Sequence, residues 1–299
     1  MAATTKAPSP VAEFTAPRTI DHLAIALSIA TSASRLVAGG TDLVPALRRG
    51  LFGNVDLLID LSHLDELSAI RRTIDGRVSV GAGATFARLT SDAMVVAHAP
   101  LLARVAAGVG SSQIRNVATL GGNVANASPC GDGTLALVAL GAEAVIIDGS
   151  GETRRCSVAG LLVGPGRTGL AVNEAIIAFE FEADTPTSRC GFAKVGARSA
   201  VTVAVLSIAA RFDVDPDTQR TRAACVAFGS VGPTAFTDVE VHEALIGVEV
   251  DGANGRCFAR ACRAAVDRSI SGRASHDYKV QAALGVALDV WHQLITSST

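Results

Sequence analysis

A short break at residues 184–188, with the sequence DTPTS, divides the chain into two stretches whose elements follow different orders. Before the break, strand-like and helix-like segments are mixed without the regular alternation of a doubly wound sheet. After it, strands are expected at about 191–198, 201–213 and 222–229, then helices near 238–246, 254–270 and 277–296. Strands grouped before helices are typical of an α+β fold. We therefore expect a first domain at 1–185, with subdomains of about 1–55 and 56–185, and a second domain at 186–299.

The composition limits the class of protein. The chain has 299 residues, of which 49% are hydrophobic and 18% charged, so it is not a disordered chain and suits about two folded domains. A formal net charge of −2 argues against a surface for nucleic acid. An aromatic content of 4% argues against base-stacking platforms.

The sequence carries no evident targeting or metal-binding signal. Its longest apolar run, at 201–210, is far shorter than the roughly 20 residues of a membrane span, and residues 1–10 lack the apolar core of a secretory signal. The six cysteines form no CxxC pair, and Cys257 and Cys262 are expected on different faces of one helix. We expect a cytoplasmic protein with no membrane span and no metal site of its own.

Local signals predict the elements of the first domain. Thr19 is a suitable N-cap for a helix at 19–30, and Asp75-Gly76 is a strong hairpin signal within 68–81. Residues 111–132 are rich in Gly, Asn and Ser and lack periodicity, so we expect a long functional loop there. Other expected elements are strands at 35–38, 56–61, 142–148 and 174–182, helices at 43–49 and 133–140, and helices opening at Thr85 and Pro100.

Two glycine-rich turns are the strongest candidate site. One is Ala38-Gly39-Gly40-Thr41-Asp42 and the other is Thr119-Leu120-Gly121-Gly122-Asn123. Paired glycines let the main chain approach a ligand closely, and successive N–H groups can converge on an anion at a helix start. Two such turns could hold a pyrophosphate from both sides. The alternative is that the glycines serve the geometry of the turns alone.

The other candidate motifs are weaker. A GxGxxG pattern at 164–169 contains Pro165 and precedes a strand, whereas a dinucleotide fingerprint must open a helix. The histidines are scattered, and there is no HExxH, Walker or GxSxG motif. Lys194 and Arg198 are either surface cations or groups that face a cleft between the domains.

These motifs together resemble the FAD-binding, or medium, subunit of the molybdenum hydroxylases, a family that includes the medium subunit of aerobic carbon monoxide dehydrogenase and the FAD domain of xanthine dehydrogenase. The first turn continues to Leu43, and the second continues through Ala127-Ser128-Pro129 to Asp132. The resemblance extends over nearly the whole chain from about Phe14. It implies a two-subdomain PCMH-type FAD-binding module and a smaller C-terminal α+β domain with a three-stranded antiparallel sheet and helices.

The resemblance also implies a function and a set of residues. The chain would carry FAD in a heterotrimeric molybdenum dehydrogenase. It would accept electrons from [2Fe–2S] clusters of a small subunit, supplied by a molybdopterin large subunit, and pass them to an external acceptor. Two heterotrimers would associate. The implied cofactor-binding residues at the pyrophosphate are Ala38, Gly39, Gly40, Thr41, Asp42, Thr119, Leu120, Gly121, Gly122 and Asn123. Asp132 would bind the flavin through its ribityl or adenosine side, and Phe192 would belong to the flavin environment. Ile176 would pack on the cofactor, and Lys194 would lie near the isoalloxazine. No catalytic residue and no metal ligand is implied.

The sequence departs from this family at two places. Many relatives have Tyr at the position of Phe192 and Asp near the positions of Val201 and Thr202. These departures leave open the flavin potential and the electron acceptor, and the chain does not indicate the substrate of the complex. Two other readings are a free-standing FAD-dependent oxidoreductase of the same fold, for which no catalytic acid is found, and a non-enzymatic assembly subunit.

Overall fold

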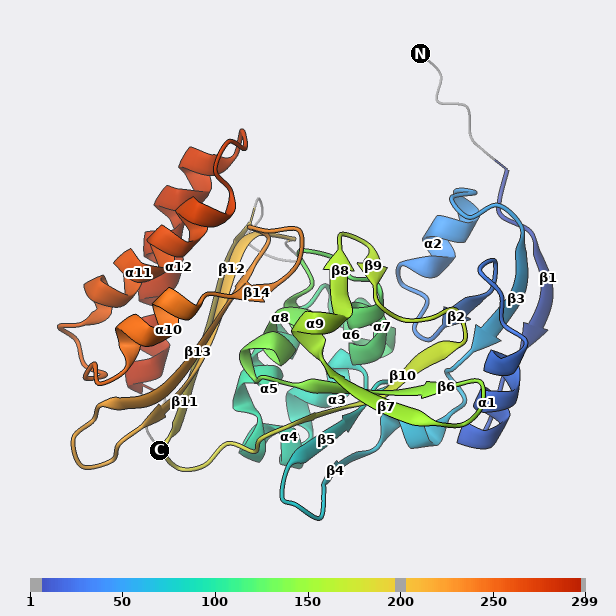
Figure 1. Ribbon diagram of the computed structural model, residues 1–299, viewed down its shortest axis with the longest axis horizontal. Helices are drawn as coiled ribbons and strands as arrows, with labels where there is room; N and C mark the ends of the chain where they lie inside the picture. The colour runs from blue at the N-terminus through green and yellow to red at the C-terminus, as the bar shows by residue number, and fades with distance from the viewer. Residues whose placement is uncertain (1–6, 197–202, 297–299) are drawn as a thin grey trace.

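The computed structural model describes residues 7–196 and 203–296 and has three parts side by side (Figure 1). Arg198, Val201 and Thr202 lie outside the described residues. The first part is a parallel sheet of order β1-β3-β2. Its elements are β1 (Val11–Thr15), α1 (Ile20–Ser28), β2 (Arg35–Val37), α2 (Leu43–Arg48) and β3 (Val55–Asp60).

Strand β3 is the centre of this first sheet. It pairs with β1 on one side and with β2 on the other, as far as Asp60. The predicted division at residue 55 would separate β3 from both partners, so the structure places the change of subdomain after this strand. Thr19 caps α1 by accepting from the N–H of His22, as its sequence position suggests.

The second part is an antiparallel sheet of order β4-β5-β10-β6-β7, with helices over one face (Figure 1). The last strand in sequence, β10, lies at the centre of this sheet. Its strands are β4 (Ile70–Arg72), β5 (Val78–Gly81), β6 (Glu143–Asp148), β7 (Thr153–Ser157) and β10 (Glu174–Phe181), and a short hairpin adds β8 (Leu162–Gly164) and β9 (Arg167–Thr168). Its helices are η1 (Asp65–Ser68), α3 (Phe86–Ser91), α4 (Ala93–His98), α5 (Pro100–Ala107), α6 (Ser112–Val117), α7 (Leu120–Ala125), α8 (Asp132–Ala139) and α9 (Val158–Leu161).

The stretch at 111–132 is not the irregular loop that the sequence predicts. It contains α6 and α7, each six residues long, with N-caps at Ser111 and Thr119. Such short helices have no room for a repeated apolar stripe, and the glycines of α7 disfavour helix in isolation. Their caps and their packing on neighbouring elements hold them instead.

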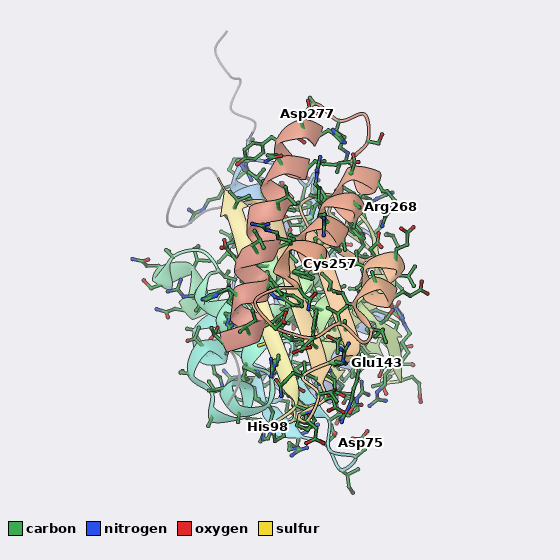
Figure 2. All side chains as sticks on the ribbon, turned by 90° about the vertical axis from the view of Figure 1, so that its left-hand side faces the viewer. Asp75, His98, Glu143, Cys257, Arg268 and Asp277 are labelled. Carbon is green, nitrogen blue, oxygen red and sulfur yellow. The ribbon has the colours of Figure 1, made fainter. Side chains whose placement is uncertain are left out.

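The third part is the C-terminal domain. It has three long antiparallel strands, as predicted, and a short fourth strand that pairs with β13. Its elements are β11 (Ser188–Gly196), β12 (Ala204–Val214), β13 (Thr221–Gly229), β14 (Phe236–Thr237), α10 (Val239–Leu245), α11 (Gly255–Ser269) and α12 (His276–Thr296). The α+β class is confirmed. On α11, Cys257 is exposed and Cys262 buried, so the two thiols lie on different faces, and Cys257 is seen on the outer surface in Figure 2.

The core of the second part continues into the C-terminal domain. The buried cluster around α5 and α8 includes Phe192 of β11, Ala209 of β12 and Ala227 of β13. A separate core lies between the other face of this sheet and α10–α12, and it contains Phe212, Phe258 and Trp291. The C-terminal sheet is therefore packed on both faces.

Candidate functional site

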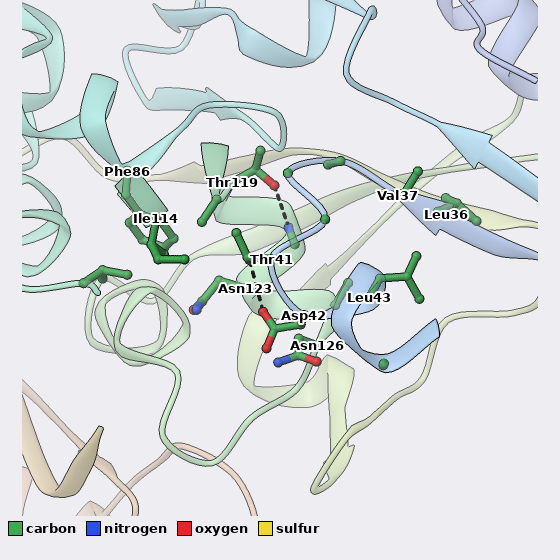
Figure 3. A pocket seen from close by; sticks show the side chains of 18 of the residues that line it. Leu36, Val37, Thr41, Asp42, Leu43, Phe86, Ile114, Thr119, Asn123 and Asn126 are labelled. Carbon is green, nitrogen blue, oxygen red and sulfur yellow. Dashed lines mark hydrogen bonds between the residues drawn. The ribbon is translucent and has the colours of Figure 1, made fainter. Parts of the chain in front are cut away.

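Two cavities adjoin at the place where the first and second parts meet. The α6 cavity, of about 320 Å³, is lined by the turn at 38–42 together with Phe86, Ile114 and Asn123 (Figure 3). The β10 cavity, of about 350 Å³, is lined by residues of 31–35, 168–172 and 174–176. Both volumes are in the range of small-molecule sites. The two cavities share a wall made by Leu36, Ala38, Thr119, Gly122 and Ala125.

The first glycine turn offers an anion-binding backbone. Gly40 has φ of +66°, in the left-handed region that glycine adopts readily. Among the described residues, none accepts a hydrogen bond from the backbone N–H groups of Gly39, Gly40, Thr41 and Asp42. All four residues line the α6 cavity. Unused, successive N–H groups of this kind are typical of sites for phosphate groups.

The two glycine motifs lie against each other. A Cβ atom built on Gly39 would be 1.9 Å from the carbonyl oxygen of Val117, the last residue of α6. Only glycine permits this approach. The turn at 38–42 is thereby held directly beside Thr119, which follows α6 and caps α7 (Figure 3).

The second glycine motif works differently from the first. It is the first turn of α7, and its N–H groups are already used: Leu120 donates to Ala84 O at 3.0 Å and Gly121 to Ala82 O at 2.7 Å. Gly122 donates to the Thr119 hydroxyl at 3.0 Å. The expectation that this motif supplies free N–H groups is therefore wrong for these residues. It supplies space, because Gly122 lines both cavities without a side chain.

Asn123 presents one half of its amide to the α6 cavity. Its Oδ1 accepts from the Thr134 N–H at 2.9 Å and from the Thr134 hydroxyl at 3.1 Å. These bonds fix the orientation of the amide. No described residue accepts a hydrogen bond from its Nδ2, which is the group left for a ligand.

The buried Asp132 and the half-buried Lys194 form an ion pair between the two domains. Lys194 Nζ lies 2.5 Å from Asp132 Oδ2 and 2.9 Å from Gly108 O. Burial raises the pKa of the Asp132 carboxyl, and Lys194 opposes that shift. Asp132 Oδ1 is buried without a hydrogen-bond partner. The pair adjoins the α6 cavity, because Lys194 bonds to Gly108 and the next residue, Val109, lines that cavity.

The structure brings together most of the predicted site residues. The turn at 38–42, Thr119, Gly122 and Asn123 line the α6 cavity, and Gly121 and Ile176 line the β10 cavity. Leu120, Asp132, Phe192 and Lys194 line neither. The backbone of Phe192 is instead bonded on both sides by the Gln293 amide, at 2.9 Å each.

Sequence reasoning missed one wall of the β10 cavity, formed by Thr31, Ser32, Ser34 and Arg35. The run of hydroxyl residues just before a strand was the available signal. The GxGxxG stretch forms the β8–β9 hairpin and opens no helix, but Thr168 at its end lines the β10 cavity.

Residues 7–196 and 203–296 contain no group of three or more His, Cys, Asp or Glu side chains that could hold a metal ion. No helix in these ranges has both the length and the apolar character needed to cross a membrane.

Comparison with known proteins agrees with this geometry. Residues 10–181 match the FAD-binding domain in molybdopterin dehydrogenases, and residues 192–294 match the C-terminal domain of carbon monoxide dehydrogenase flavoproteins. The chain is similar to the xanthine dehydrogenase FAD-binding subunit of Escherichia coli, with 31% identity over 61% of this chain and 62% of the relative. The region matched by this chain therefore covers less than two thirds of that relative's length.

Solved structures extend the similarity to the whole chain. Carbon monoxide dehydrogenase from Hydrogenophaga pseudoflava matches with a TM-score of 0.86 and 25% identity, over 97% of this chain and 99% of the other. Quinoline 2-oxidoreductase from Pseudomonas putida 86 matches with the same TM-score and identity, over 98% and 99%. The fold and the site thus define an FAD-binding flavoprotein. The chain belongs to the family of FAD-binding domains in molybdopterin dehydrogenases, which confirms the resemblance found in the sequence.

Proposed function

We propose that this chain is the FAD-carrying electron-transfer subunit of a heterotrimeric molybdenum dehydrogenase. It accepts electrons from the [2Fe–2S] clusters of a small subunit, which receives them from a molybdopterin large subunit, and passes them to an external acceptor. The complex is a cytoplasmic dimer of heterotrimers. The observation that carries the proposal is the row of unused N–H groups at 39–42 in the α6 cavity, which adjoins the β10 cavity so that the two together suit a dinucleotide.

The residues of the chain have distinct roles in this function. The turn at 39–42 holds the pyrophosphate, and Gly122 leaves room for it. Asn123 Nδ2 adds a side-chain donor. Asp132, Phe192 and Lys194 set the environment of the flavin half from beside the α6 cavity, and Ile176 packs on the cofactor from the β10 cavity. When bound, FAD supplies the redox chemistry, and the protein supplies its binding and orientation.

The proposal is tested by purifying the chain with and without the products of neighbouring coding sequences. We expect a yellow protein that releases intact FAD on denaturation and that co-purifies with an iron–sulfur chain and a molybdopterin chain. Reduction of the iron–sulfur chain should then reduce the flavin. A colourless chain that fails to bind added FAD would contradict the proposal. Turnover of a small substrate by the isolated chain would favour the free-standing oxidoreductase instead.

A further inference from the structure

Strand β11 lies at one edge of the C-terminal sheet, because the order β11-β12-β13-β14 leaves it a single strand partner. The backbone groups on its other side need other partners. Two helices supply them. Arg104 of α5 donates from Nη1 to Cys190 O at 3.0 Å, and Gln293 of α12 bonds to the backbone of Phe192. The open edge of β11 is therefore closed by side chains from α5 and α12.

Gln293 takes the place of a neighbouring strand at Phe192. Its Oε1 accepts from the Phe192 N–H at 2.9 Å, and its Nε2 donates to Phe192 O at 2.9 Å. Arg104 Nη1 donates to the same Oε1 at 2.7 Å, which assigns the oxygen and the nitrogen of the amide. The amide is thus fixed in orientation and holds both backbone groups of one residue. A single side chain sets the position of this part of the strand.

Lys194 lies two residues after Phe192, so the two side chains are on the same face of β11. The pairing of β11 with β12 changes register between Val195 and Gly196, directly after this lysine. The regular ladder ends there, so β12 holds the end of the strand less firmly than its middle. The bonds from Gln293 therefore fix the strand close to Lys194.

The position of Lys194 decides how the charge of Asp132 is compensated. Lys194 Nζ lies 2.5 Å from Asp132 Oδ2, and Asp132 Oδ1 is buried without a hydrogen-bond partner among the described residues. A displacement of β11 that weakens this contact leaves a buried carboxylate with less of its counter-charge. The pair adjoins the α6 cavity, so the charge beside the cofactor depends on where β11 is held.

We propose that Gln293 is a positioning residue for the flavin: it holds β11 so that Lys194 stays on Asp132, and it thereby raises the reduction potential of bound FAD. This inference rests on the proposed function, in which FAD binds beside this ion pair. Reduced flavin carries more negative charge than oxidised flavin, so an uncompensated Asp132 carboxylate disfavours the reduced form. Gln293 lines neither cavity, so it acts through β11.

The test measures the midpoint potential of FAD bound to the full chain. Lys194→Met should favour the oxidised form about hundredfold, a fall of about 60 mV for a two-electron couple. Gln293→Met removes both bonds to Phe192 without a change of charge, and it should favour the oxidised form about tenfold, a fall of about 30 mV. The matched control is Gln281→Met. Gln281 is exposed on the same helix and its side chain hydrogen-bonds to no described residue, so the potential should equal that of the parent.

Two more variants show whether Gln293 acts through Lys194. Gln293→Met should lower the potential no further in the Lys194→Met background. Arg104→Lys keeps the positive charge but loses the guanidinium that bonds to both Gln293 and Cys190 O, so it should lower the potential by a smaller amount. This milder variant decides the question if Gln293→Met does not fold.

The chain without FAD gives a second readout. There, Gln293→Met should lose more stability at pH 8 than at pH 5, because the Asp132 carboxyl is charged to a greater extent at the higher pH. The loss of hydrogen bonds alone would lower stability equally at both pH values. If the unaltered chain binds no FAD, the proposed function fails, and this comparison still tests the positioning of Lys194.

Two results would overturn the positioning role. One is an unchanged potential in both Gln293→Met and Arg104→Lys; for a chain that binds no FAD, equal losses of stability at pH 5 and pH 8 have the same meaning. The other is a fall of potential in the Lys194→Met background as large as in the parent, which would show that Gln293 acts by another route.

Discussion

Gly39 and Gly40 of the first turn are each required to be glycine, but for different physical reasons. Gly40 is required by its positive φ, whereas Gly39 is required because the Val117 carbonyl occupies the space of a side chain. The sequence predicts the first requirement, since glycine pairs are typical of such turns. It does not predict the second, which depends on a contact between segments far apart in the chain.

Gly39→Ala should therefore separate the two glycine motifs. The added Cβ forces the turn away from α6, so we expect a loss of about 1–3 kcal/mol in the free energy of unfolding. We also expect FAD affinity to fall more than about tenfold, because the free N–H groups move. Chemical denaturation and FAD titration measure both. Gly53→Ala is the control, since nothing lies within 4 Å of its Cβ position. Equal affinities in the two variants would contradict the expectation.

The Asp132–Lys194 pair predicts a pH-dependent stability. A carboxyl whose pKa is raised in the folded state binds its proton more tightly there, so unfolding free energy falls as pH rises through that folded pKa. Lys194→Met removes the charge that opposes the shift, and the pKa of Asp132 rises further. We expect the variant to be less stable than the parent by about 3 kcal/mol near pH 8. The gap should narrow at pH 5, because lowering the pH favours the protonated, uncharged form of a carboxyl whose pKa is raised.

Denaturation at both pH values measures this gap. The control is the double variant Asp132→Asn/Lys194→Met, which has no carboxyl to titrate at this position and should show the same gap at both pH values. A gap in the single variant that is equally wide at both pH values would show that Asp132 does not titrate in this way.

At the scale of elements, caps and turns were the features that the sequence predicted best. Thr19, Thr85 and the Asp75-Gly76 turn are local signals, and the structure has the expected element at each. Helices α6 and α7 were not predicted. Their N-caps are equally local signals, but six residues are too few to show a helical periodicity. The order of the second sheet was not predicted either, because β10 pairs with β5 across a long separation in sequence.

Thr119 both caps α7 and lines the candidate site, so its replacement should affect both the stability of the fold and the binding of FAD. Thr119→Ala removes the acceptor of the Gly122 N–H, and we expect a loss of about 1 kcal/mol in the free energy of unfolding. FAD affinity should also fall, because Thr119 lines both cavities. Thr19→Ala removes an equivalent cap on α1, outside both cavities. It should lower stability by a similar amount and leave FAD affinity unchanged; a similar loss of affinity in both would refute the distinction.

At the scale of the whole molecule, one core spans the second part of the FAD-binding module and one face of the C-terminal sheet. The break at 184–188 marks a real change of element order, but it does not mark two independent bodies, because α8 packs on β12 and β13. The sequence indicates domains through linkers, and it carries no comparable signal for an interface made of small residues.

The shared core predicts a single unfolding transition. Trp291 is the only tryptophan and is buried in the C-terminal core, so its fluorescence reports that domain, while release of FAD reports the other. On heating the FAD-bound chain, we expect both signals to change at the same temperature. As a control for probe artefacts, far-ultraviolet circular dichroism should give the same midpoint. A tryptophan transition well separated from flavin release would mean that the two domains unfold independently.

Helix α8 packs on a sheet surface of small residues: Ala209 and Ala227 are fully buried, and a Cβ on Gly229 would come within 3.4 Å of Leu135. A surface of such small residues is complementary to the side chains of one particular helix and packs poorly against a helix with different side chains. We therefore expect that C-terminal domains can be exchanged between relatives only where this sheet surface is complementary to α8. The packing of α8 on the sheet limits such an exchange more than the linker at which the domains are joined.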